Sequence, residues 1–153
     1  MNSFDIIKTG DPILRKKCEE INDDNMQQMT WYLKEMLEFV KWKGSGAVWL
    51  ALPQIGEPYR GFVIHAKNRN IVESEIFINP LLVSKSQASD FMDEECLSEP
   101  WVLVKMRRAL SVVIEYTNHS WTRTKKSFYW FPARVIQHEL DHLNGILLAD
   151  YSK

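Results

Sequence analysis

The most specific chemical pattern in the chain lies near the C-terminus and reads Gln137-His138-Glu139-Leu140-Asp141-His142. Residues four apart lie on one face of an α-helix, so the imidazoles of His138 and His142 can reach a single metal ion. Glu139 is rotated about 100° from His138, which places its carboxylate beside the metal as a general base for a metal-bound water. The alternative is a solvated helix with two unrelated histidines, and the pattern favours the metal site.

The residues around this motif predict the helix that it needs. Pro132 suits the first turn of a helix, because its φ is fixed and its missing N–H has no partner there. Ile136, Leu140 and Leu143 recur at helical spacing and are expected to face a core. Val135, His138 and His142 form a neighbouring stripe, and Asn144-Gly145 supplies a left-handed stop.

A catalytic metal site needs a third protein ligand, and the candidates are Cys, His, Asp or Glu residues elsewhere in the chain, Cys96 among them. Cys96 lies in a polar, turn-like stretch, Asp93 to Pro100, among predicted strands. The alternative is a small buried hydrophobe. Acidic neighbours raise the pKa of a free thiol, which disfavours Cys96 as a nucleophile on its own. A bound metal reverses this effect, because coordination deprotonates the thiol.

Composition restricts the class of protein. The 153 residues are 45% hydrophobic and 25% charged, which fits one globular domain over 1–153. A net charge of -1 gives no basic footprint for nucleic acid. No apolar run approaches the length of a membrane span, and the N-terminus lacks a secretory pattern. Two cysteines, Cys18 and Cys96, form no disulfide framework, so we expect an intracellular location.

The remaining pattern is a helix followed by short strands. Apolar residues at helical spacing predict a helix from about Asn25 to Lys41. Gln54 stands alone in an apolar run, where its amide either caps a loop or donates into a pocket, and the loop interpretation is favoured. Strands are expected at Phe62–Ile64, Ile76–Ile78, Ala109–Tyr116 and Trp121–Phe128.

Taken together, three stretches of the chain resemble the peptide deformylase family, in the order that the family has them. Leu50-Ala51-Leu52-Pro53-Gln54 resembles G-x-G-L-A-A-x-Q, and Glu94-Glu95-Cys96-Leu97-Ser98 resembles E-G-C-L-S. Gln137 to Gly145 closely matches Q-H-E-x-D-H-L-x-G. The resemblance implies an α+β fold, with mixed, mainly antiparallel sheets around a C-terminal metal-binding helix. It also implies removal of the N-formyl group from the initiator methionine of newly made polypeptides, with release of formate.

The same resemblance implies roles for individual residues. Cys96, His138 and His142 would hold the metal, Fe²⁺ in the family and often Zn²⁺, Ni²⁺ or Co²⁺ in preparations. Glu139 would be the general acid and base, while the Gln54 amide and the Leu97 N–H would form the oxyanion hole. One such donor is typically worth about 3–4 kcal/mol of barrier. The walls of an apolar pocket for the methionine side chain are expected to be Val48, Trp49 and Ile136.

The resemblance also implies a biological setting. The expected partners are formyl-methionyl nascent peptides at the ribosome, without direct binding to nucleic acid or membrane. We expect a monomer in the cytoplasm, encoded by a bacterium or a phage.

The chain departs from the family pattern at specific positions. The two glycines of the first motif fall on Ala47 and Trp49, and the glycine of E-G-C-L-S is Glu95. An apolar stretch, Trp101-Val102-Leu103, replaces the usual arginine. These departures keep two alternatives open, a non-catalytic relative and one of altered specificity. A third alternative is a generic H-E-x-x-H zinc peptidase, whose third metal ligand would lie outside the stretch around Cys96. A fourth is a metal-free Cys/His amidase, whose activity would survive chelators.

Overall fold

The computed structural model describes residues 3–43, 48–68 and 71–152, without the side chains of residues 48, 68 and 71. Two further predictions from the sequence, a loop that opens at Gly44-Ser45-Gly46 and a turn at Asn68-Arg69-Asn70, fall wholly or mostly outside these ranges. The helices are α1 (Met26–Lys43) and α2 (Trp130–Leu143), with three short 3-10 helices, η1 (Pro12–Arg15), η2 (Leu52–Ile55) and η3 (Leu148–Tyr151). The strands are β1 (Val48–Ala51), β2 (Gly61–Asn68), β3 (Ile71–Lys85), β4 (Ser89–Cys96), β5 (Glu99–Ala109), β6 (Ser111–Thr117) and β7 (Arg123–Tyr129).

The strands form two sheets. Five of them lie side by side in the order β1-β2-β3-β6-β7, and β4 pairs with β5 as a separate hairpin. The four strand pairings of the larger sheet and the β4–β5 pairing are all antiparallel. The α+β fold class with mainly antiparallel sheets is therefore confirmed.

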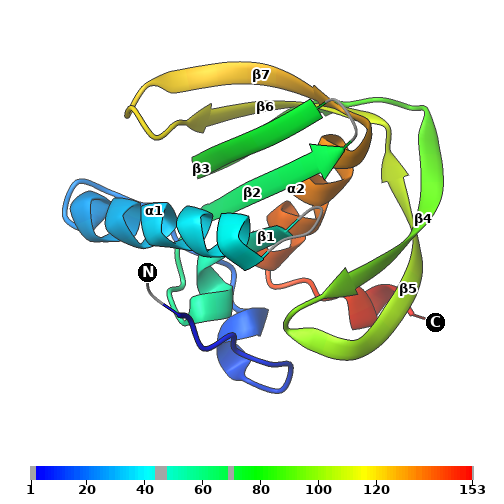
Figure 1. Cartoon of the computed structure of the whole chain (residues 1–153), viewed down its shortest axis with the longest axis horizontal. Helices are drawn as coiled ribbons and strands as arrows, with labels where there is room; N and C mark the ends of the chain where they lie inside the picture. Colours follow the sequence, from blue (N-terminus) through cyan, green and yellow to red (C-terminus); the bar gives the residue numbers. More distant parts are fainter. Residues whose placement is uncertain (1–2, 44–47, 69–70, 153) are drawn as a thin grey trace.

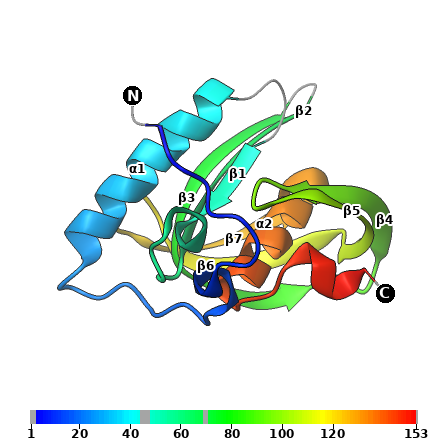
Figure 2. The ribbon, with the colours of Figure 1, turned by 90° about the horizontal axis from the view of Figure 1, so that it is seen from below.

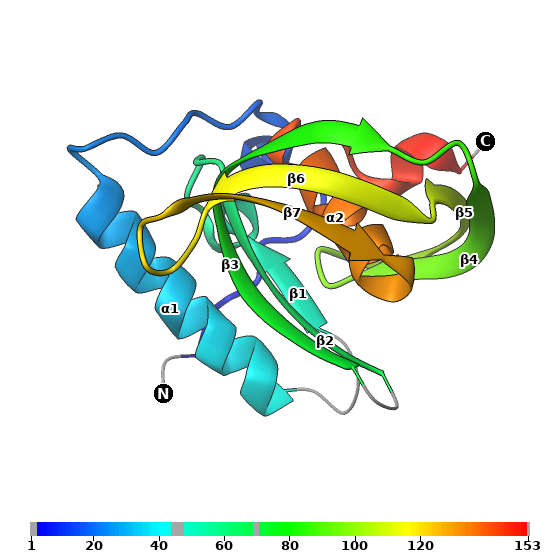
Figure 3. The same ribbon diagram turned by 90° about the horizontal axis from the view of Figure 1, so that it is seen from above.

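The two helices cover opposite faces of the five-stranded sheet (Figures 1 and 3). Side chains alternate along a strand, so Val63 joins the core with α1, while Phe62 and Ile64 face α2. On the α2 side, the rings of Phe62 and Phe77 stack with centroids 4.6 Å apart. The β4–β5 hairpin lies across α2 from this sheet, so α2 is enclosed on two sides (Figure 1).

The C-terminal helix follows the sequence prediction closely. α2 begins at Trp130, which puts Pro132 in its first turn, and Ile136, Leu140 and Leu143 are all buried. The helix stops at Asn144, and Gly145 adopts the left-handed conformation with φ 73°. Among the described residues, no helix is long and apolar enough to cross a membrane.

The strand prediction differs from the structure in two places. The polar stretch Asp93 to Pro100 holds a turn at Leu97-Ser98, as predicted, but the residues on either side of that turn belong to two strands, Ser89–Cys96 and Glu99–Ala109. Most of β4 is exposed on both faces, so it lacks the apolar alternation that marks a strand. The sequence also predicts that Asn79-Pro80 ends the second strand and that Leu81-Leu82-Val83 continues it after the break. In the structure β3 is one strand, with a register shift between Ile78 and Leu81 at that point.

The stop after α2 gives a prediction about stability. A Cβ added at Gly145 would lie 2.4 Å from the carbonyl oxygen of Arg15, and the backbone is left-handed there. We expect Gly145→Ala to lower the free energy of unfolding by roughly 1–3 kcal/mol or more in a urea titration.

Gly10 provides the matched control. It is also left-handed, with φ 103°, but a Cβ there meets nothing within 4 Å. Gly10→Ala should therefore cost clearly less than Gly145→Ala. Equal losses in the two variants would contradict the close contact between Gly145 and Arg15.

Candidate metal centre

The three predicted metal ligands meet in one place. Cys96 at the end of β4 and the two histidines of α2 offer ligand atoms that all lie within 4.8 Å of one another. The Cys96 Sγ is 3.2 Å from His142 Nε2. All three side chains are at least nine-tenths buried. Such a compact group of one sulfur and two nitrogen donors matches the coordination of a divalent transition metal.

The tautomer of His138 is set by a carboxylate that the sequence analysis did not single out. His138 Nδ1 lies 3.1 Å from Glu94 Oε1. Burial alone would raise the pKa of Glu94, but hydrogen bonds from His138 and Arg108 outweigh it and lower the pKa to about 2. Glu94 is therefore ionised and accepts a hydrogen bond from the Nδ1–H of His138. This leaves the lone pair of His138 on Nε2, the nitrogen that can bind a metal.

The Glu94 carboxylate also binds two buried arginines. Arg108 donates to both of its oxygens, through Nη2 at 3.0 Å and Nε at 3.1 Å. Arg134 Nη1 donates to Oε2 at 2.6 Å. Arg134 precedes His138 by four residues and so lies on the same face of α2, which is the sequence signal that could have revealed this cluster.

The polar atoms around the site support a bound cation. Neither carboxylate oxygen of Glu139 has a hydrogen-bond partner among the described residues, and nor does His142 Nδ1. Burial, with Asp141 next, raises the pKa of Glu139 well above its usual value. Burial and then Glu139 raise the pKa of the Cys96 thiol to about 12. A divalent cation among these groups would favour the thiolate and the carboxylate, so the residues present fit a metal.

Gln54 faces the same site in a fixed orientation. It is buried in η2, and its Oε1 accepts the N–H of Ala51 at 2.9 Å. Its Nε2 therefore points the other way, toward Ser98 Oγ at 3.1 Å and Cys96 Sγ at 3.6 Å. Both interpretations of Gln54 therefore apply in part, because its oxygen caps the start of η2 and its amide nitrogen is a donor aimed at the candidate ligand.

The N-terminal segment holds the turn that contains Leu97, at the tip of the hairpin (Figure 2). Lys8 Nζ donates to the carbonyl of Leu97 at 3.0 Å, and Thr9 N–H donates to that of Ser98 at 2.8 Å. Leu97 is half-buried and lines a cavity of about 780 Å³ together with Cys96 and His138.

The predicted pocket walls divide between this cavity and the core. Trp49 lines the cavity, and its ring packs edge-on against Phe131 and His138 with centroids 5.9 Å away in each case. Val135 is among the lining residues. Ile136 is not, because it is fully buried in the core between α2 and the sheet. The described side chains do not include that of Val48, which begins β1.

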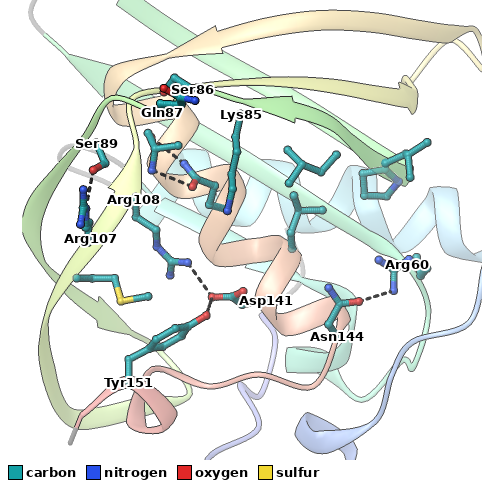
Figure 4. A pocket seen from close by; sticks show the side chains of 17 residues that line it. Arg60, Lys85, Ser86, Gln87, Ser89, Arg107, Arg108, Asp141, Asn144 and Tyr151 are labelled. Atoms are coloured by element: carbon teal, nitrogen blue, oxygen red, sulfur yellow. Dashed lines mark hydrogen bonds and ion pairs between the residues drawn. The ribbon is translucent and has the colours of Figure 1, made fainter.

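A second cavity, of about 850 Å³, lies against another face of α2 (Figure 4). Arg108 donates to Asp141 at 2.8 Å there, and Tyr151 donates to the same oxygen at 3.0 Å. None of the predicted metal ligands lines this cavity. The chemistry is therefore expected in the smaller cavity, where the metal ligands are.

Comparison with known proteins decides the family. Residues 3–153 match the family model described as polypeptide deformylase. The chain belongs to the polypeptide deformylase family. A peptide deformylase of Pseudothermotoga lettingae is 36% identical over 142 residues, which cover 92% of this chain and 78% of the relative.

Solved deformylase structures share the fold. The crystal structure of a probable peptide deformylase from Synechococcus phage S-SSM7 has a TM-score of 0.84 at 33% identity and covers 97% of this chain and 99% of its own. The Met-Ala-Ser bound structure of the class I type b peptide deformylase from Acinetobacter baumannii has a TM-score of 0.81 at 25% identity, with 96% of both chains covered. The activity of this deformylase is the metal-dependent removal of the N-formyl group from newly made polypeptides.

The Glu94 cluster gives a second prediction. Glu94→Gln would leave Arg108 and Arg134 buried with less negative charge, and breaking a buried pair costs roughly 3–5 kcal/mol. We expect a loss of that size in the free energy of unfolding, measured by urea titration with the same added metal.

Asp90 provides the control for this variant. It pairs with Arg134 at 2.7 Å but is 57% exposed, so Asp90→Asn should cost no more than about 1 kcal/mol. If Glu94→Gln proved as mild as Asp90→Asn, the buried carboxylate would not be the anchor of this cluster.

Proposed function

We propose that Cys96, His138 and His142 bind the single divalent metal ion of this deformylase. The support is the compact group of three buried donors and the hydrogen bond that fixes the tautomer of His138. The ion that we propose is Fe²⁺, on the resemblance to the family, and Zn²⁺, Ni²⁺ or Co²⁺ can occupy the same donors. This donor set is the single observation on which the proposal depends most.

Each of the other polar groups has one task in the proposed reaction. A metal bound here would lower the pKa of its water towards about 7 and polarise the formyl carbonyl. Glu139 takes the proton of the attacking water and then gives it to the leaving amine. Its raised pKa suits this role, and so do its two carboxylate oxygens, which have no hydrogen-bond partner among the described residues. The Gln54 amide and the Leu97 N–H donate to the oxygen on which negative charge develops.

The substrate backbone is proposed to lie between two strand edges. β1 is the outer strand of its sheet, and β4 pairs with β5 on one side only. Trp49 of β1 and Asp93 to Cys96 of β4 both line the cavity, so an extended chain end can pair with these edges. Trp49, Phe131 and Val135 supply apolar surface for the methionine side chain, and Val135 takes the role expected of Ile136.

The biological setting remains that of the family. We propose that residues 1–153 act as one domain and as a monomer, on formyl-methionyl chains at the ribosome. A cytoplasmic location in a bacterium or a phage-infected cell is supported by the similarity to bacterial and phage deformylases.

The test joins a metal assay with an activity assay. Protein purified without oxygen, or reloaded with Ni²⁺, should contain one metal per chain and release formate from formyl-Met-Ala-Ser, and chelation should stop the release. Metal-loaded protein that releases no formate would be a non-catalytic relative. Cleavage of unblocked peptides instead would indicate a general peptidase.

Glu139→Gln separates metal binding from catalysis. The variant should keep its metal and lose roughly 10²- to 10⁴-fold in kcat, because no other carboxylate can move the proton. Cys96→Ala is the comparison, since it should lose metal and activity together. Full turnover in metal-loaded Glu139→Gln would refute the proposed role of Glu139.

A further inference from the structure

Two acidic side chains on the outer face of β4 have no partner. Asp93 and Glu95 are exposed, and no hydrogen bond or ion pair joins either of them to another described residue. Alternation along the strand turns them away from Glu94 and Cys96, which are buried. Both nevertheless line the cavity that holds the metal ligands, because the cavity runs along the edge of β4.

The other charged groups near them are already engaged. Arg134 pairs with Asp90 and Glu94, and Lys8 donates to the carbonyl of Leu97. Lys105 lies opposite Asp93 in the ladder, but its ammonium is placed over the ring of Phe91, 5.9 Å from the centroid. Among the described residues, neither Asp93 nor Glu95 is ion-paired, so the outer rim of the cavity carries two unpaired negative charges, while the ammonium of Lys8 lines the cavity beside Leu97.

The pleat of an extended substrate determines which of its residues meets this rim. This step rests on the proposed function, in which the formylated chain end lies along the edge of β4. When an extended substrate pairs with β4, its side chains point alternately to the inner and the outer face of β4, as the side chains of β4 do. If methionine points inward with Cys96 toward Val135, the next residue points outward, to the face of Asp93 and Glu95.

We propose that this deformylase selects chains with lysine or arginine directly after the formyl-methionine. The cationic head would lie beside Glu95 and Asp93, and the aliphatic stem would pack on Leu103, which is 62% exposed and lines the same cavity. Glu95 stands where the family pattern has glycine, so this preference is a property of this chain.

The test compares tripeptides that differ only in the second residue. Formyl-Met-Xaa-Ser peptides with Xaa as lysine, norleucine or glutamate are assayed for formate release with Ni²⁺-loaded protein. At low ionic strength, kcat/KM should be at least about fivefold higher for lysine than for glutamate, with norleucine between them. At 1 M salt, where the screening length is about 3 Å, the ratio should fall below about twofold.

Charge variants locate the source of the preference. Glu95→Gln should reduce the lysine-to-glutamate ratio, and Glu95→Lys should invert it. Glu38→Lys is the matched control, because Glu38 is an exposed residue of α1, on the other side of the sheet. It makes the same change in net charge and should leave the ratio as in the unmodified protein.

Two results would overturn the proposal: equal kcat/KM for lysine and glutamate peptides at low salt, or a lysine preference that persists in Glu95→Lys. A protein that hydrolyses none of the peptides would contradict the proposed function instead. Calorimetric binding of Met-Lys-Ser against Met-Glu-Ser would then still decide the question, since equal affinities would refute the charge preference.

Discussion

The Glu94 carboxylate joins the β4–β5 hairpin to α2, and the geometry of the metal centre depends on that junction. This carboxylate accepts hydrogen bonds from His138 Nδ1 and Arg134, which are on α2, and from Arg108, which is on β5. Two of the metal-ligand candidates are on α2 and the third is on β4, so the distance between them is set by how these elements are tied. A buried anion with three strong donors fixes that distance more rigidly than apolar contact alone.

The same cluster explains why charge is tolerated in so small a core. Removing Glu94 and the arginines from water is costly, and the cost is offset only while every partner is present. Asp141 and Tyr151 extend the cluster on the far side of Arg108 (Figure 4). Asp90 extends it at Arg134. Glu139 is the exception, a buried carboxylate whose two oxygens accept no hydrogen bond from the described residues, with Oε1 3.9 Å from His138 Nε2. Such a group is consistent with a proton-transfer role.

Local patterns revealed the parts of this site that lie within one element. The spacing of His138 and His142, the apolar stripe and the Asn144-Gly145 stop all belong to one helix, and a helical period exposes them. Glu94, Arg108 and Arg134 come from three elements and are 14 to 40 residues apart. The helical spacing of Arg134 and His138 places these two on one face of α2, but no periodicity links that face to Glu94 or Arg108, so the contact with them appears only in the folded chain.

The fold class was predicted correctly, but β4 was not, for a related reason. β4 carries few apolar side chains, because its stability comes from the ladder with β5 and from the buried charges beneath it. It therefore looked like a polar turn in the sequence. Ile136, which the sequence analysis placed in the wall of a pocket, lies in the core, and its neighbour Val135 lines the cavity instead. Neighbouring helical residues point about 100° apart, so one of two adjacent side chains can face the cavity and the other the core.

The most direct test of the account is X-ray absorption at the metal edge of the zinc-loaded protein. Convergence of Cys96, His138 and His142 predicts one sulfur at about 2.3 Å and two imidazole nitrogens at about 2.0–2.1 Å. The sulfur shell should disappear in Cys96→Ser. A first shell of nitrogen and oxygen alone in the unmodified protein would contradict the central claim.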